Sequence, residues 1–100
     1  MDNNKLPNPR FKDELLEVLT LAAKDKKFLD DFLKDLLAPA EYRELIVRWQ
    51  ILKQLERGTS QRQICQDLKA SITTVTRGSH VLENHAGGAN QMLRKLVARK

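Results

Sequence analysis

The chain has 100 residues, of which 41% are hydrophobic, and its 18 Lys and Arg exceed its 13 Asp and Glu to give a formal net charge of +5. This length and hydrophobic content predict one compact domain and leave no room for a second independent core. The single cysteine, Cys65, excludes an intramolecular disulfide, and no secretory signal or apolar run of about 20 residues is recognisable, so we expect a cytoplasmic protein with no membrane partner.

Helices are predicted along almost the whole chain, because apolar residues recur three and four positions apart and no alternating β-branched run occurs between turn signals. The fold class is therefore expected to be all-α. Residues 1–10 are rich in asparagine and proline, so we expect a mobile arm there. Residues 11–58 are expected to form the dimerisation helices. The first of these has an apolar face of Phe11, Leu15, Val18, Leu19 and Ala22.

The next two helices are predicted from their end signals. Asp25 is the expected N-cap of a helix whose apolar stripe consists of Phe28, Leu29, Phe32, Leu33, Leu36 and Leu37. Because this stripe is very wide, we expect a second subunit to cover it, and the alternative is a monomeric bundle that covers it with its own helices. Pro39 suits the first turn of the following helix, and Gly58 suits its C-terminal end.

Residues 60–82 have the pattern of a helix-turn-helix. Ser60 and Gln63 fit a capping box at the start of its first helix, and Ser71 is the expected N-cap of its second. The core between the two helices is expected to contain Ile64, Cys65, Leu68, Ala70 and Val75. This turn commonly contains glycine, so Lys69 must adopt a left-handed conformation or turn the chain by another route. A last amphipathic helix is expected over residues 89–99.

The second helix of this motif is expected to lie in the major groove of double-stranded DNA. Threonine suits such a position, because its hydroxyl can bond bases or phosphates while its methyl group packs on thymine. Residues 59–100 hold seven basic and two acidic side chains, which favours a polyanionic partner. The expected DNA-binding residues are Ser60, Gln61, Arg62, Ile72, Thr73, Thr74 and Thr76. The alternative is an ordinary pair of core helices with a threonine-rich surface.

Several of these segments resemble the tryptophan repressor family. The resemblance covers about residues 37–82 and includes Leu37-Ala38-Pro39, Arg48, Ser60-Gln61-Arg62 and Thr73-Thr74-Val75-Thr76-Arg77-Gly78-Ser79. It implies an intertwined helical homodimer that binds operator DNA as a transcriptional repressor. It also implies L-tryptophan as the corepressor and genes of tryptophan biosynthesis or transport as the targets.

The same resemblance implies a corepressor site. Arg48 and Arg77 match the two arginines that clamp the ligand in the family, and a guanidinium can stack on an indole while it bonds a carboxylate. Gly78 would leave room for the indole. The expected corepressor-binding residues are Leu37, Arg48, Leu52, Thr74, Arg77 and Gly78. Two positions depart from the family pattern, because Ala38 and Val81 replace a threonine and a serine, and this loss of hydroxyls could weaken binding by about 1 to 3 kcal/mol.

Two other functions are compatible with the sequence. A repressor of the same fold that answers to another ligand, or to none, is the nearest alternative, and a helical protein-interaction module is the alternative from another class. An enzyme is not expected, because the sequence has no phosphate-binding glycine loop and no paired metal-ligand motif. His80 and His85 are expected to be surface or packing residues, and neither a metal nor a resident cofactor is expected.

Overall fold

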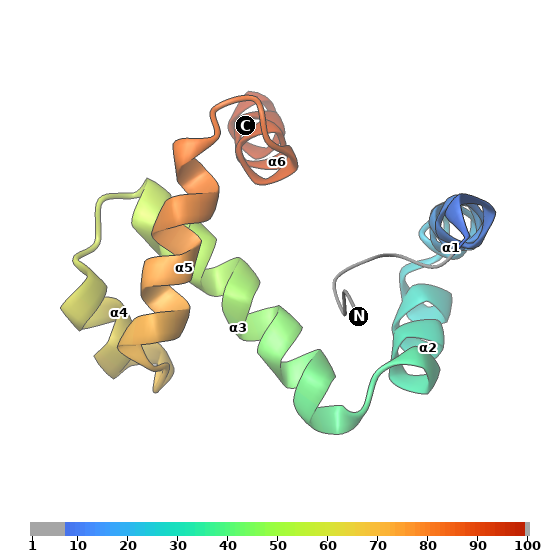
Figure 1. The fold of residues 1–100 in the computed structure, drawn as a ribbon, viewed down its shortest axis with the longest axis horizontal. Helices are drawn as coiled ribbons and strands as arrows, with labels where there is room; N and C mark the ends of the chain where they lie inside the picture. Colours follow the sequence, from blue (N-terminus) through green and yellow to red (C-terminus); the bar gives the residue numbers. More distant parts are fainter. Residues whose placement is uncertain (1–7, 100) are drawn as a thin grey trace. The chain divides into compact units, whose positions relative to one another are not determined.

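A computed structural model describes residues 8–99, and within this range the chain forms six α-helices and no strand (Figure 1). The all-α prediction is confirmed. In chain order the helices are α1 (Pro9–Ala22), α2 (Lys26–Leu36), α3 (Pro39–Glu56), α4 (Gln61–Leu68), α5 (Ile72–Glu83) and α6 (Gly88–Ala98). None of the described helices combines the length and the apolarity that crossing a bilayer requires.

The chain divides within α3 into two compact units, one that ends at Tyr42 and one that begins at Arg43. In the N-terminal unit, α1 packs against α2. The predicted arm over residues 1–10 is too long at its C-terminal end, because Pro9 and Arg10 belong to α1; its residues 1–7 lie outside the described part of the chain. The helix starts earlier because Asn8 is its N-cap: Asn8 Oδ1 accepts a hydrogen bond from the Arg10 amide at 2.8 Å. Pro9, the first helical residue, is also favoured at that position.

The N-terminal unit contains a three-residue polar cluster that joins α2 to the first turn of α3. The Tyr42 hydroxyl donates to Asp30 Oδ1 at 2.9 Å, and Lys34 Nζ lies 3.0 Å from Asp30 Oδ2. The hydrogen bonds from Lys34 and Tyr42 lower the pKa of the Asp30 carboxyl. The same carboxylate raises the pKa of both Lys34 and Tyr42. Asp25 caps α2 as predicted, with Oδ1 accepting from the Lys27 amide at 3.0 Å.

The core of the C-terminal unit lies where α3, α4 and α5 meet. Its fully buried members are Ile51, Ile64 and Val75, one from each helix. Val47, Leu55, Cys65, Leu68 and Ala70 pack against them. The core predicted from the helix-turn-helix pattern is therefore present. In addition, α3 contributes Val47, Ile51 and Leu55 to it.

The side chain of Asn90 in α6 forms hydrogen bonds with the C-terminal end of α5. Asn90 Nδ2 donates to the carbonyl oxygens of Leu82 at 2.9 Å and Asn84 at 3.0 Å. These carbonyls lie at the end of α5, where helical partners run out, so Asn90 satisfies acceptors that the helix leaves open. Leu93 of α6 is buried.

Candidate functional site

The geometry of the α4–α5 pair is fixed by its caps and its turn. Ser60 Oγ accepts from the Gln63 amide at 3.1 Å, and Ser71 Oγ accepts from the Thr74 amide at 3.1 Å. The reciprocal half of the predicted capping box is absent, because the Gln63 side chain donates to Asp67 Oδ1 instead. Lys69 takes the left-handed conformation that sequence analysis considered, with φ 54° and ψ 40°. It is the only residue other than glycine with a positive φ in the described part of the chain.

A hydrogen-bonded bridge links the start of α4 to the middle of α5. Gln61 Nε2 donates to Ser79 Oγ at 2.9 Å, and Thr76 Oγ1 donates to Gln61 Oε1 at 3.3 Å. All three side chains are half-buried. Gln61 and Thr76, both predicted DNA contacts, therefore also have bonds within the protein that fix the angle between the two helices. Ser79 was named only as part of the family-like segment, and its bond to Gln61 was not predicted, because no short-range pattern connects it to a residue 18 positions earlier.

The remaining predicted DNA contacts differ in their access to solvent. Arg62 is exposed on α4, and Thr73 is exposed in the first turn of α5. Ile72 is 55% exposed, which is unusual for a large apolar side chain and suits contact with a partner. Thr74 is half-buried, and its hydroxyl lies 2.9 Å from Ser71 Oγ. The first turn of α5 thus presents Ile72 and Thr73 outward and holds Thr74 against the protein.

The second candidate site is a pocket of about 140 Å³ between α3 and α5. Its lining residues are Arg48, Ile51, Leu52, Thr74, Arg77, Gly78 and Val81. Five of the six predicted corepressor-binding residues thus line one pocket. The sixth, Leu37, lies at the C-cap of α2 in the N-terminal unit, and its role stays a prediction. Ile51 was missed, although the spacing of Arg48, Ile51 and Leu52 by three and four positions places them on one face of α3.

Gly78 allows α5 to approach α3 closely. A Cβ atom at this position would lie 2.9 Å from Ile51 Cγ2 and 3.2 Å from Leu55 Cδ1. From the family resemblance, Gly78 was expected to leave room for a ligand. In the structure it both lines the pocket and permits the helix contact that forms the pocket floor.

The pocket has a cationic edge and an apolar interior. Arg48 and Arg77 carry the charge, and both are exposed, while Ile51 is fully buried beneath them. Arg48 Nη2 lies 3.1 Å from Glu44 Oε1, one turn earlier on α3. This combination fits a ligand with a flat apolar body and an anionic group, because guanidinium groups can both stack on a ring and hold a carboxylate.

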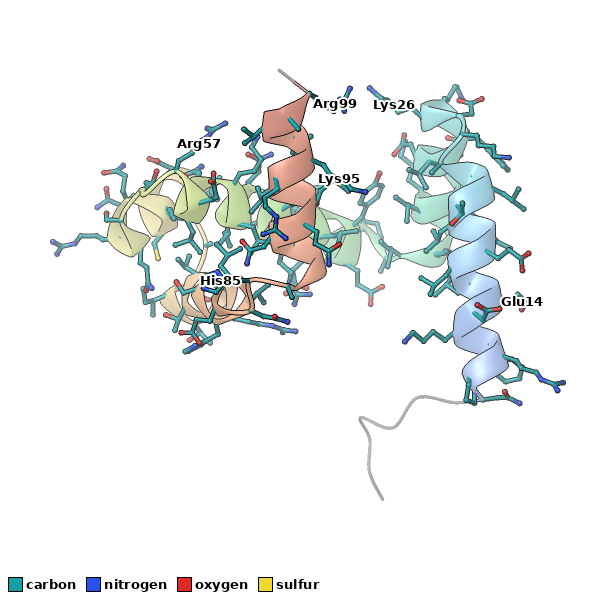
Figure 2. All side chains as sticks on the ribbon, turned by 90° about the horizontal axis from the view of Figure 1, so that it is seen from above. Glu14, Lys26, Arg57, His85, Lys95 and Arg99 are labelled. Atoms are coloured by element: carbon teal, nitrogen blue, oxygen red, sulfur yellow. The ribbon has the colours of Figure 1, made fainter. Side chains whose placement is uncertain are left out.

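The two histidines lie outside both candidate sites. His80 Nδ1 lies 3.3 Å from Glu83 Oε1 near the end of α5, and His85 is exposed in the α5–α6 connection (Figure 2). Among the described residues, no group of three or more His, Cys, Asp or Glu side chains has the geometry to hold a metal ion.

Comparison with known proteins places the chain in a family. The model of the family described as Trp repressor protein matches residues 12–97, which spans both units of the structure. The chain is 34% identical over 88 residues to a Trp operon repressor homolog of Photobacterium profundum, covering 87% of this chain and 84% of that protein. It is also 34% identical over 92 residues to a Trp operon repressor homolog of Vibrio campbellii, covering 89% and 91%. Over 69 residues it is 41% identical to an Actinobacillus succinogenes protein of the same description, covering 68% and 67%. No solved structure matches the chain significantly.

Proposed function

The chain belongs to the Trp repressor family and is a DNA-binding transcriptional repressor, and we propose that L-tryptophan is its corepressor. The family is a regulatory one and not an enzyme family. We further propose that genes of tryptophan biosynthesis or transport are the targets, and that the protein acts in the cytoplasm, where bacterial DNA lies. Its partners are then double-stranded operator DNA, free L-tryptophan and a second copy of the chain.

One observation carries the corepressor proposal: Arg48 and Arg77 lie at the edge of the same apolar pocket, beside Gly78. The two guanidinium groups suit the carboxylate of tryptophan and a face of its indole, and Ile51 and Leu52 offer apolar contacts to the ring. Val81 also lines this pocket, where a hydroxyl would be expected from the family resemblance. Affinity for tryptophan is therefore proposed to be lower than a hydroxyl-bearing pocket would give, by up to about two decades.

Thr74 is the residue through which ligand occupancy is proposed to reach DNA. It lines the pocket, and its amide is the one that Ser71 holds at the start of α5. A ligand packed against Thr74 would favour one orientation of this helix terminus. In the proposed complex Ile72 and Thr73 meet base edges, while Ser60, Gln61, Arg62 and Thr76 position the motif on the sugar–phosphate backbone.

A homodimer is proposed because both units expose large apolar side chains. The exposed set includes Phe11, Leu15, Leu16, Phe28 and Leu36 in the N-terminal unit and Leu45, Ile46, Met92 and Val97 in the C-terminal unit. A groove of about 460 Å³ lies along α3 and α6, and both apolar and charged side chains line it: Trp49, Lys53, Glu56, Arg57, Leu93, Leu96, Val97 and Arg99. Figure 2 labels Arg57 and Arg99 among them. A second copy is the occupant that would bury these surfaces symmetrically. Sedimentation equilibrium should then give a mass of twice 11.5 kDa.

The proposal is tested by titrating DNA fragments from the chain's own upstream region with and without L-tryptophan. We expect specific binding that tightens at least about tenfold with tryptophan, since corepression is a coupling free energy between two sites. If the affinity for DNA is the same with and without millimolar tryptophan, the protein is a repressor that responds to another ligand or to none. If the protein does not bind DNA, or if its DNA affinity does not change with salt concentration, a protein-interaction module would be favoured instead.

A further inference from the structure

Helix α5 is joined to neighbouring helices by side-chain hydrogen bonds at two places. Near its middle it is bonded to Gln61 of α4, and at its C-terminal end it is bonded to Asn90 of α6. Asn90 Nδ2 donates to the carbonyl oxygen of Leu82 at 2.9 Å and to that of Asn84 at 3.0 Å. In the described part of the chain, the bond to Leu82 is the only one that runs from a side chain of one helix to the backbone of another.

The connection between α5 and α6 is closed by further hydrogen bonds. The Asn84 carbonyl oxygen, which Asn90 holds, also accepts from the Gly87 amide at 2.9 Å. A Cβ atom at Gly87 would lie 3.1 Å from the same oxygen, so the chain turns tightly there. The neighbouring residue Gln91 donates from Nε2 to the Ala86 carbonyl oxygen at 2.7 Å. The Gln91 bond thus ends on the connection, whereas the Asn90 bonds reach α5 itself.

The amide group of Asn90 is suited to fix a direction as well as a distance. Its two N–H hydrogens lie in one plane, and each has an acceptor, because the two carbonyl oxygens belong to residues two positions apart. An N–H···O bond weakens steeply as it bends away from linearity. The last turn of α5 therefore cannot swing relative to α6 without the loss of at least one bond. The Asn90 side chain is half-buried, which limits its replacement by water.

We propose that Asn90 is a positioning residue for DNA recognition, because it sets the direction of α5 from the end that lies farthest from Ile72 and Thr73. Thr73 precedes Leu82 by nine residues, which is about 14 Å along a helix axis. A change of about 10° in the direction of α5 would then move Thr73 by about 2 Å, more than a hydrogen bond to a base edge tolerates. This inference rests on the proposed placement of α5 on DNA and goes beyond it.

A purely structural role for Asn90 makes a different prediction. If Asn90 only satisfies open carbonyl groups, its loss lowers the stability of the fold and reduces affinity for every DNA sequence by the same factor. If it sets the direction of α5, its loss falls on specific binding. Nonspecific binding depends on phosphate contacts, which carry no sequence information and tolerate a small change of helix direction.

The experiment measures the affinity of the full chain, with L-tryptophan present, for two DNA duplexes. One is the tightest-binding fragment of the chain's own upstream region, and the other is a scrambled duplex of the same length. Asn90→Ala should weaken the upstream fragment about tenfold, the scale of one lost base contact, and the scrambled duplex by less than about twofold. Gln91→Ala is the matched control, because it removes the same amide group from the next position, where the bond ends on the connection. Its two affinities should equal those of the wild type.

A second variant keeps the test valid if Asn90→Ala does not fold. Asn90→Asp preserves the shape of the side chain but has no hydrogen to donate at neutral pH. Residue 90 lies in the first turn of α6, where a carboxylate is favourable, so α6 itself should be kept. The added negative charge should weaken both duplexes, and the ratio of their affinities should fall as in Asn90→Ala. Thermal unfolding shows which variants are folded at the temperature of the titration.

The outcomes separate this inference from the proposed function. A wild-type preference for the upstream fragment, with an unchanged ratio of the two affinities in the folded Asn90 variants, would overturn the role of Asn90 and leave the repressor proposal intact. An equal fall of the ratio in Gln91→Ala would overturn it as well, because the connection and not Asn90 would then direct α5. Wild-type protein that does not distinguish the two duplexes would remove the proposed reading of DNA by α5, and the role of Asn90 with it.

Discussion

Gly78 of α5 lies so close to Ile51 of α3 that a Cβ atom at position 78 would be 2.9 Å from Ile51 Cγ2. Ile51 is fully buried and cannot move aside freely. Gly78→Ala should therefore destabilise the protein by about 1 to 3 kcal/mol through overpacking, which outweighs the gain of about 1 kcal/mol in helix propensity. Urea unfolding measures the difference.

Gly88→Ala is the control for this prediction, because a Cβ at Gly88 meets nothing within 4 Å. It should leave the free energy of unfolding unchanged or raise it by up to about 1 kcal/mol. Equal effects of the two substitutions would show that the close contact between α3 and α5 does not limit the fold.

Lys69 is expected to strengthen DNA binding and to lower the free energy of unfolding of the protein. Its left-handed backbone, with φ 54°, is one that glycine adopts freely, so Lys69→Gly should raise the free energy of unfolding by about 1 kcal/mol. The same substitution removes an exposed cation next to the start of α5. DNA affinity should fall for all sequences, and the slope of log affinity against log salt should shrink by about 1.

Lys69→Asn separates the two effects, because asparagine tolerates this conformation and has no charge. It should show the same weaker salt dependence as Lys69→Gly. An unchanged salt slope in both variants would mean that Lys69 makes no contact with phosphate and serves the turn alone.

Gln61 is expected to act on DNA recognition mainly through the helix angle. Gln61→Ala breaks its bonds to Ser79 and Thr76, so we expect a loss of about 1 kcal/mol in stability and a larger loss of specific than of nonspecific DNA affinity. The salt slope should stay close to that of the wild type, because no charge changes. Arg62→Ala is the comparison, since it removes an exposed cation and should reduce the slope. A uniform loss over all DNA sequences in Gln61→Ala would indicate a simple backbone contact.

The cluster of Tyr42, Asp30 and Lys34 should make stability depend on pH in the acid range. Asp30 has a lowered pKa in the folded protein, below its ordinary value of 3.8. Its contribution is therefore fully present above about pH 4 to 5 and is lost as the pH falls through the folded pKa. Tyr42→Phe removes one of the two hydrogen bonds responsible, so its thermal midpoint should lie below that of the wild type at neutral pH and approach it in acid. A difference that stays constant down to pH 2 would contradict this assignment.

The sequence contains local signals for the ends of helices, and three N-caps were predicted correctly from them. Asp25, Ser60 and Ser71 each cap the helix predicted for them, because a cap needs only a side chain and an amide two or three residues away. The start of α1 was predicted too late, since the prolines and asparagines before Phe11 were read as a loop signal, whereas Asn8 and Pro9 together start a helix.

Some residues of each candidate site were predicted from the sequence, and others were not. The family resemblance indicated Leu37, Arg48, Leu52, Thr74, Arg77 and Gly78, and all of them except Leu37 line the pocket. The link from Gln61 to Ser79 was not predictable, because it depends on how two helices meet and not on any spacing within one of them. The same holds for the contact of Gly78 with Ile51, which is 27 positions earlier in the printed sequence. Binding of DNA and tryptophan by these residues stays a prediction.

Thr74 has two roles in the structure, since its side chain lines the pocket and its amide is capped by Ser71 at the start of α5. If α5 contacts the operator as proposed, a mutation at Thr74 that admits a new ligand would also disturb DNA recognition. On the proposed function, a change of ligand is therefore easier at Val81, which lines the pocket but lies away from the start of α5, and paralogues that differ there would keep their old promoters while they respond to a different nutrient.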